Sequence, residues 1–161
     1  MAVILITGGA RSGKSKRAEM RARGFPGRPV YLATAEALDF EMETRIARHR
    51  ARRGADWIER EVPLDLVPAL VASEGGGARL VDCLTLWLSN WLLACLDDPP
   101  RRGLDEFAAE RAALLELVAA PPGPLILVAN EVGLGLVPET ALGRRFRDEA
   151  GRLNQDVARS E

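Results

Sequence analysis

The sequence predicts an α/β protein with a mostly parallel central sheet that helices flank on both faces. Two observations carry this prediction. Strand-like and helix-like segments alternate along the chain, and most strand-like segments are continuous apolar runs. A strand that is apolar on both sides needs cover on both faces, which βαβ units provide. The 161 residues, 47% of them hydrophobic, predict one domain over residues 1–161.

Four apolar runs read as buried strands, at residues 3–7, 29–33, 79–82 and 125–129. A fifth and shorter strand signal lies at Trp57 and Ile58, between two acidic residues. In a fold of this kind another strand would follow the last helix, and the chain supplies none there. We therefore expect the domain to lack a final C-terminal strand.

Six segments read as helices, at residues 15–23, 40–53, 64–72, 85–96, 104–119 and about 139–158. Asp39 is a candidate cap for the second helix, and Gly54 its stop. The third helix requires Pro68 to lie in its first turn, where proline is tolerated. Proline- and glycine-rich segments at 98–103 and 121–124 separate neighbouring elements.

Composition excludes several classes of protein. The net charge of −1 gives no sign of a nucleic-acid partner. Polar residues interrupt the most apolar stretch, 80–96, so it predicts no membrane span. The N-terminus lacks the basic region of a signal peptide. Cys83 and Cys95 show no metal-binding spacing and are expected to be reduced core residues of a cytoplasmic protein.

A phosphate-binding loop follows the first strand and precedes the first helix. The run matches the pattern G-x-x-x-x-G-K-S/T, and its residues are Gly8, Gly9, Ala10, Arg11, Ser12, Gly13, Lys14 and Ser15. Its glycines let backbone N–H groups wrap the phosphates, Lys14 supplies a positive charge, and Ser15 offers a hydroxyl to Mg²⁺. The helix begins at the anion, so its positive dipole end faces the charge.

A phosphate-binding loop also needs a carboxylate for Mg²⁺, and such residues commonly end a buried strand. Asp82 ends the strand 79–82 and is our candidate, because parallel strand ends converge on the nucleotide. The alternative for Asp82 is a helix cap at a strand–helix junction. Glu131, after the strand 125–129, is a second candidate for the metal or the substrate, and a solvated loop acid is its alternative.

His49 is the only histidine, and it lies in an arginine-rich helix. Helical geometry places Met42, Ile46 and His49 on one side, with Arg45 and Arg53 close by. Arginines bind phosphates, and their charge favours the neutral imidazole that nucleophilic attack on phosphorus requires. The alternatives are a structural histidine and a solvated basic helix face.

The chain resembles the adenosylcobinamide kinase / adenosylcobinamide-phosphate guanylyltransferase family of cobalamin biosynthesis. The resemblance spans nearly the whole chain, and the segments around His49 and at 130–139 are its specific part. The matching segments are residues 8–15, 31–35, 39–49, 57–61, 130–139 (NEVGLGLVPE), 146–148 (FRD) and 151–155 (GRLNQ).

The resemblance implies a RecA-like phosphate-loop fold, generally a homotrimer, and two activities. A nucleoside triphosphate, ATP or GTP, phosphorylates adenosylcobinamide. GTP then transfers GMP to the product through a GMP–histidine intermediate, for which only His49 is available. The same resemblance assigns nucleotide contacts to Ala33, Thr34, Ala35, Arg50, Ala51, Arg52, Arg53, Glu61 and Asp82.

The expected catalytic residues are thus His49 and Lys14, with Mg²⁺ bound by Ser15 and Asp82. Two other functions stay open at this point. One is a small-molecule kinase in which His49 is structural. The other is a RecA-like ATPase, for which the chain is short and its charge too close to neutral.

Overall fold

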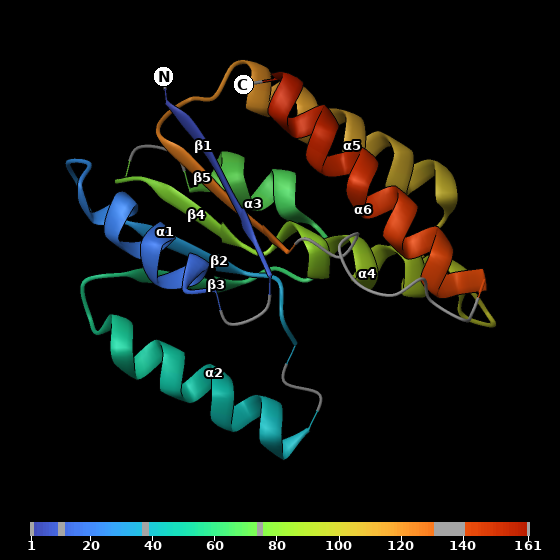
Figure 1. Cartoon of the computed structure of the whole chain (residues 1–161), viewed down its shortest axis with the longest axis horizontal. Coiled ribbons are helices and arrows are strands. Elements are labelled where there is room, and N and C mark those ends of the chain that lie inside the picture. Colours follow the sequence, from blue (N-terminus) through green and yellow to red (C-terminus); the bar gives the residue numbers. More distant parts are fainter. Residues whose placement is uncertain (1, 10–11, 37–38, 74–75, 131–140, 161) are drawn as a thin grey trace.

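A five-stranded parallel sheet lies at the centre of the molecule (Figure 1). The computed structural model describes residues 2–9, 12–36, 39–73, 76–130 and 141–160. The strand order is β1-β5-β4-β2-β3, and every neighbouring pair is parallel. The predicted fold class is confirmed. The strands are β1 (Val3–Gly8), β2 (Val30–Ala33), β3 (Ile58–Glu61), β4 (Arg79–Asp82) and β5 (Leu125–Asn130).

Six helices occupy the described residues, in the predicted order. They are α1 (Lys14–Arg23), α2 (Phe40–Arg53), α3 (Leu66–Ala72), α4 (Leu84–Leu96), α5 (Leu104–Ala119) and α6 (Ala141–Ser160). Several boundaries differ from the sequence prediction, most of them by one or two residues. The short strand begins after Trp57 and runs on to Glu61, and α3 begins at Leu66, which leaves Pro68 in the first turn. The predicted start of the last helix, at 139, lies outside the described residues.

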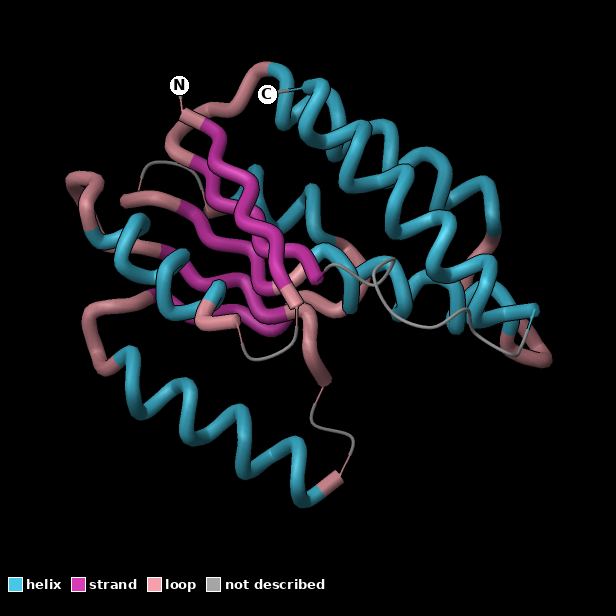
Figure 2. The backbone as a smooth tube through the Cα atoms, viewed as in Figure 1, coloured by secondary structure: helices cyan, strands magenta, loops and turns pink. Residues whose placement is uncertain are grey.

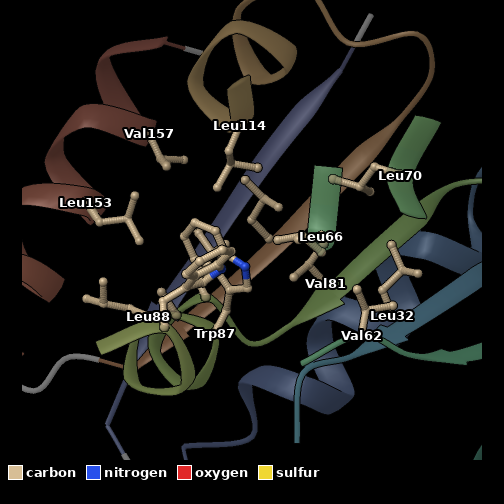
Figure 3. Packing of buried hydrophobic residues seen from close by; sticks show 14 of the residues in the cluster. Leu32, Val62, Leu66, Leu70, Val81, Trp87, Leu88, Leu114, Leu153 and Val157 are labelled. Carbon is tan, nitrogen blue, oxygen red and sulfur yellow. The ribbon is translucent and has the colours of Figure 1, made fainter. Parts of the chain in front are cut away.

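Different helices cover the two faces of the sheet. Leu125 and Leu127 of β5 face a core that includes side chains of α3, α4, α5 and α6. The alternate residues Ile126 and Val128 face a second core with side chains of α1. Figure 3 shows the larger core. The strands β2, β4 and β5 therefore bury both their odd and their even side chains, which explains their continuous apolar runs.

Indole nitrogens and two thiols are buried within the cores on the two faces of the sheet. The indole nitrogens of Trp87 and Trp91 both donate to the carbonyl oxygen of Leu64, at 2.8 and 2.9 Å. Cys83 and Cys95 are buried free thiols, as the sequence analysis predicted. Across the described part of the chain, every helix falls short of the length and apolarity that a bilayer crossing requires.

The carboxyl ends of the strands meet at one edge of the sheet. Gly8 of β1 is opposite Asn130 of β5, and Ala33 of β2 is opposite Asp82 of β4. Loops that leave this edge therefore start side by side. Helix α2 extends away from the sheet on this side (Figure 2), and Arg53 is its one buried residue.

Candidate nucleotide-binding site

The Gly-rich segment lies between β1 and α1, in the strand–loop–helix context that the motif requires. Gly13 precedes α1 with a φ of 80°, a conformation that favours glycine, and no side chain caps the helix. The ammonium of Lys14 donates to the carbonyl oxygen of Gly9 at 2.9 Å. A Cβ on Gly8 would lie 2.6 Å from the hydroxyl of Ser12, so any other residue there would force the Ser12 side chain to move. Ala10 and Arg11 lie outside the described residues.

Asp82 lies at the centre of a hydrogen-bonded group beside this loop. Its Oδ2 atom accepts from the hydroxyl of Ser15 at 2.9 Å and from that of Tyr31 at 2.6 Å. The helix-cap alternative for Asp82 is wrong, because Cys83 is the N-cap of α4 and its Sγ accepts from the N–H of Leu86. Asp82 is thus directed toward the phosphate-binding loop and does not cap α4.

Burial of the Tyr31 and Cys83 side chains keeps both of them protonated. Burial, and then the carboxylate of Asp82, raises the pKa of Tyr31 far above its ordinary value. Burial also raises the pKa of the Cys83 thiol to about 11. Tyr31 is therefore a permanent hydrogen-bond donor to Asp82 at physiological pH.

A pocket of about 470 Å³ joins the loop, the strand ends and α2. Lys14 and Ser15 line it from α1, and Asp82 lines it from β4. The α2 face predicted from helical spacing lines the opposite part, with Met42, Arg45, Ile46, His49 and Arg53. The structure thus brings His49 and the phosphate-binding loop, 34 residues apart in the sequence, into one cavity.

The other residues that the resemblance assigns to the nucleotide divide into two groups. Ala33 and Ala35 line the pocket. Thr34 is fully buried, and its hydroxyl exchanges hydrogen bonds with the backbone of Cys83, at 2.8 and 2.9 Å. Glu61 is exposed at the end of β3 and lines a separate hollow. The structure does not bring Thr34 or Glu61 to the pocket.

The arginine-rich end of α2 binds carboxylates of the protein itself. Arg50 pairs with Glu59 at 2.6 Å, and Arg52 pairs with Glu19 at 2.8 Å. Neither arginine lines the pocket, and Ala51 faces another hollow. In the segment 50–53, which the resemblance assigns to the nucleotide, Arg53 alone lines the pocket.

Two residues of the site, Tyr31 and Asn130, were not among the predicted site residues. Tyr31 was noted only as part of a matching segment, although it lies on the same sheet face as Asp82. The register that pairs Ala33 with Asp82 places it there, and strand periodicity could have indicated this once the register was known. Asn130 also lines the pocket, at the end of β5. Glu131, the second metal candidate, lies outside the described residues.

The Ser15–Asp82 pair fits a magnesium ion shared with a nucleotide. Among the described residues, no group of three or more histidine, cysteine, aspartate or glutamate side chains could hold a metal by itself. Mg²⁺ in nucleotide sites commonly takes one or two protein oxygens and completes its shell with phosphates and water. A hydroxyl and a carboxylate within hydrogen-bonding distance, beside Lys14, are a donor set of that kind.

A phosphate-binding loop on a parallel sheet, with a carboxylate at the end of a nearby strand, defines a nucleotide-binding protein of the phosphate-loop class. Comparison with known proteins identifies the family. The chain belongs to the cobinamide kinase / cobinamide phosphate guanyltransferase family, which it matches over residues 4–161. The resemblance noted in the sequence is confirmed.

Named relatives are similar over most of their length. The chain is 54% identical over 155 residues to the bifunctional adenosylcobalamin biosynthesis protein CobP of Pseudomonas aeruginosa, an alignment that covers 96% of this chain and 86% of the relative. It is 43% and 42% identical over 165 residues to the proteins named CobU of Salmonella typhimurium and Escherichia coli. Each of these two alignments covers 97% of this chain and 90% of the relative.

Proposed function

We propose that this chain catalyses two consecutive steps of cobalamin biosynthesis. It phosphorylates adenosylcobinamide with ATP or GTP, and it then transfers GMP from GTP to adenosylcobinamide phosphate. The products of the second step are adenosylcobinamide-GDP and pyrophosphate. Membership of the family supports the two activities. The observation that carries the proposal is that His49 lines the same pocket as Lys14, Ser15 and Asp82.

The phosphate-binding loop would serve both steps. Its backbone N–H groups and the ammonium of Lys14 are placed to neutralise the triphosphate. Ser15 and Asp82 would hold Mg²⁺, which supplies charge stabilisation at the phosphates when it is bound. In the kinase step these residues position the γ-phosphate for attack by the substrate hydroxyl, and phosphoryl transfer needs little else from the protein.

The guanylyl step requires a nucleophile, and His49 is the imidazole available. One of its ring nitrogens attacks the α-phosphorus of GTP, and the bond from that phosphorus to the bridging oxygen of pyrophosphate breaks. A phosphate oxygen of the corrinoid substrate then attacks the same phosphorus, and the P–N bond breaks to regenerate His49. Arg45, one turn before His49, lines the pocket and is placed to stabilise the charge that develops.

The exposure of His49 favours this role over a structural one. A structural histidine is normally buried or hydrogen-bonded. In the described part of the chain, His49 is exposed and its imidazole has no hydrogen-bond partner. A small-molecule kinase without guanylyl transfer would leave this placement unexplained. The net charge of −1 likewise gives no support to a RecA-like ATPase that acts on nucleic acid.

We further propose that the protein is a cytoplasmic homotrimer whose partners are the corrinoid and nucleotide substrates, with no nucleic acid. The two buried free thiols suit a reducing compartment. The resemblance to the family supports the trimer. Sedimentation equilibrium of the purified chain tests this assignment, and a monomer at micromolar concentration would contradict it.

Incubation with α-labelled GTP tests the proposed function. The wild-type protein should retain acid-labile label, and His49→Ala should retain none while it still phosphorylates adenosylcobinamide. Arg48→Ala is the matched control, because Arg48 is an exposed neighbour that does not line the pocket. An unlabelled wild-type protein with kinase activity would support the simple kinase instead. A labelled His49→Ala protein would show that the nucleophile is wrong.

A further inference from the structure

The helix that carries His49 is attached to the rest of the fold at one end. Of the residues of α2, Arg53 alone is buried, and its side chain is 3% exposed. His49 lies one turn before it, about 6 Å along the helix axis. Figure 1 shows the remainder of α2 extending away from the sheet. The contacts of this end of α2, among which those of Arg53 are the buried ones, therefore determine where His49 lies relative to the phosphate-binding loop.

Arg53 is bound on two sides by carboxylates from different elements. Its Nε donates to Glu59 of β3 at 2.9 Å. Its Nη1 lies 3.6 Å from the carboxylate of Glu19, which is itself buried in α1, the helix of the phosphate-binding loop. Arg23, also of α1, donates to the backbone carbonyl oxygen of Arg53 at 2.9 Å. The end of α2 is thus fixed to both α1 and β3.

The guanidinium of Arg53 lies over an aromatic ring that belongs to the hydrogen-bonded group around Asp82. The Arg53 carbon Cζ is 3.5 Å from the centre of the Tyr31 ring. The hydroxyl of that same tyrosine donates to Asp82. One contact path therefore runs from α2 through Arg53 and Tyr31 to the carboxylate beside Ser15.

We propose that Arg53 is a positioning residue, which holds His49 in register with the phosphate-binding loop by pairing with Glu19 and Glu59 and stacking on Tyr31. The inference rests on the proposed transfer of GMP through His49. It differs from the role that the resemblance implies, because a side chain surrounded by Glu19, Glu59 and Tyr31 presents little surface to a nucleotide.

Attack on phosphorus is sensitive to such positioning. Reacting atoms need to be about 3–3.5 Å apart, and a displacement of about 1 Å can slow a reaction about 100-fold. Lysine at position 53 would keep the positive charge between Glu19 and Glu59. It would lose the flat stack on Tyr31 and the paired donors, which arginine alone provides. Arg53→Lys should therefore displace His49 without removing the charge from the site.

The test separates the rate of GMP transfer from nucleotide affinity. At saturating α-labelled GTP, Arg53→Lys should form the labelled protein at least tenfold more slowly than the wild type. Its affinity for GTP, measured in the His49→Ala background, should change less than threefold. Glu59→Gln, a milder change on a part-exposed partner, should slow labelling in the same way. Arg48→Lys is the control, since its side chain is exposed and does not line the pocket.

A distance measurement tests the positioning without any turnover. Spin labels on cysteines introduced at Arg17 of α1 and Arg48 of α2, both exposed, report how α2 lies relative to the loop helix. The distance distribution should broaden or shift in Arg53→Lys and stay unchanged in a variant at exposed Arg21. An unchanged distribution would overturn the inference even if the protein forms no GMP adduct. A GTP affinity lowered more than tenfold, with normal labelling at saturation, would overturn it by making Arg53 a nucleotide ligand.

Discussion

Replacing Asp82 by asparagine should sharply raise the Mg²⁺ concentration that activity requires. The amide is nearly the same size as the carboxylate, so the fold is kept. The side chain loses the negative charge that would face the cation beside Ser15. It also weakens the two hydrogen bonds that Oδ2 now accepts, from Ser15 at 2.9 Å and from Tyr31 at 2.6 Å. The variant therefore changes metal binding and local stability together.

The two effects are similar in free energy, and different measurements report them. A carboxylate and a doubly charged cation about 4 Å apart attract by about 2 kcal/mol even at the dielectric constant of water. Losing that attraction raises the half-saturating Mg²⁺ concentration about 30-fold. A hydrogen bond to a charged group contributes about 2 kcal/mol. Weakening such a bond should lower Tm by roughly 4–8 °C in a domain of this size.

Tyr31→Phe separates the two effects, because it removes only the hydroxyl and leaves the ring under Arg53. We expect Tyr31→Phe to lower Tm by a similar amount and to leave the Mg²⁺ requirement within about threefold of the wild type. The assay is a Mg²⁺ titration of both activities beside a thermal melt of each variant. The reasoning is refuted if Asp82→Asn shifts Tm but not the titration, and Glu131 then becomes the metal candidate.

Three further predictions concern charge. Lys14→Ala should raise the Kd for GTP at least about tenfold and slow the kinase step, since the phosphates lose a fixed counterion; unchanged affinity and turnover would contradict the phosphate-loop assignment. Arg45→Ala should raise KM for GTP by about tenfold. An equal rise in KM in Arg48→Ala would show that the effect comes from a general loss of positive charge. Burial raises the pKa of the Glu110 carboxyl, so its contribution to stability is full at low pH and is lost as the pH rises through that pKa. Glu110→Gln keeps an acceptor for the N–H of Val67, and melts should show a higher Tm than wild type at pH 8 and no difference below about pH 4.

Local sequence patterns predicted much of the fold and part of the site. Helical spacing placed Met42, Ile46 and His49 on one face, and the structure confirms that all three line the pocket. The end of an apolar strand identified Asp82, because a polar residue there must lie at the sheet edge. Such inferences need only the period of an element and its end, and both are written in the local sequence.

Pairings between distant segments could not be predicted in that way. Arg52 and Glu19 are 33 residues apart, and nothing in either segment identifies the partner. A basic run on a helix looks the same whether it faces phosphates or carboxylates of the same chain. The cap of α4 was missed for a related reason, since Cys83 takes the position where an aspartate is preferred. To predict either the Arg52–Glu19 pair or the Cys83 cap, the three-dimensional arrangement must be known.

The attachment of α2 suggests how one phosphate site supports two reactions that depend to different degrees on the position of α2. Lys14, Ser15 and Asp82 belong to α1 and β4, whose neighbouring residues Ala18 and Val81 are fully buried. His49 belongs to a helix with one buried side chain. If the proposed function is right, a change in the loop should impair both reactions, because both use the same triphosphate site. A change at Arg53 should impair GMP transfer much more than phosphorylation, because phosphorylation needs no nucleophile from α2. The ratio of the two rates therefore measures the placement of His49 independently of nucleotide binding.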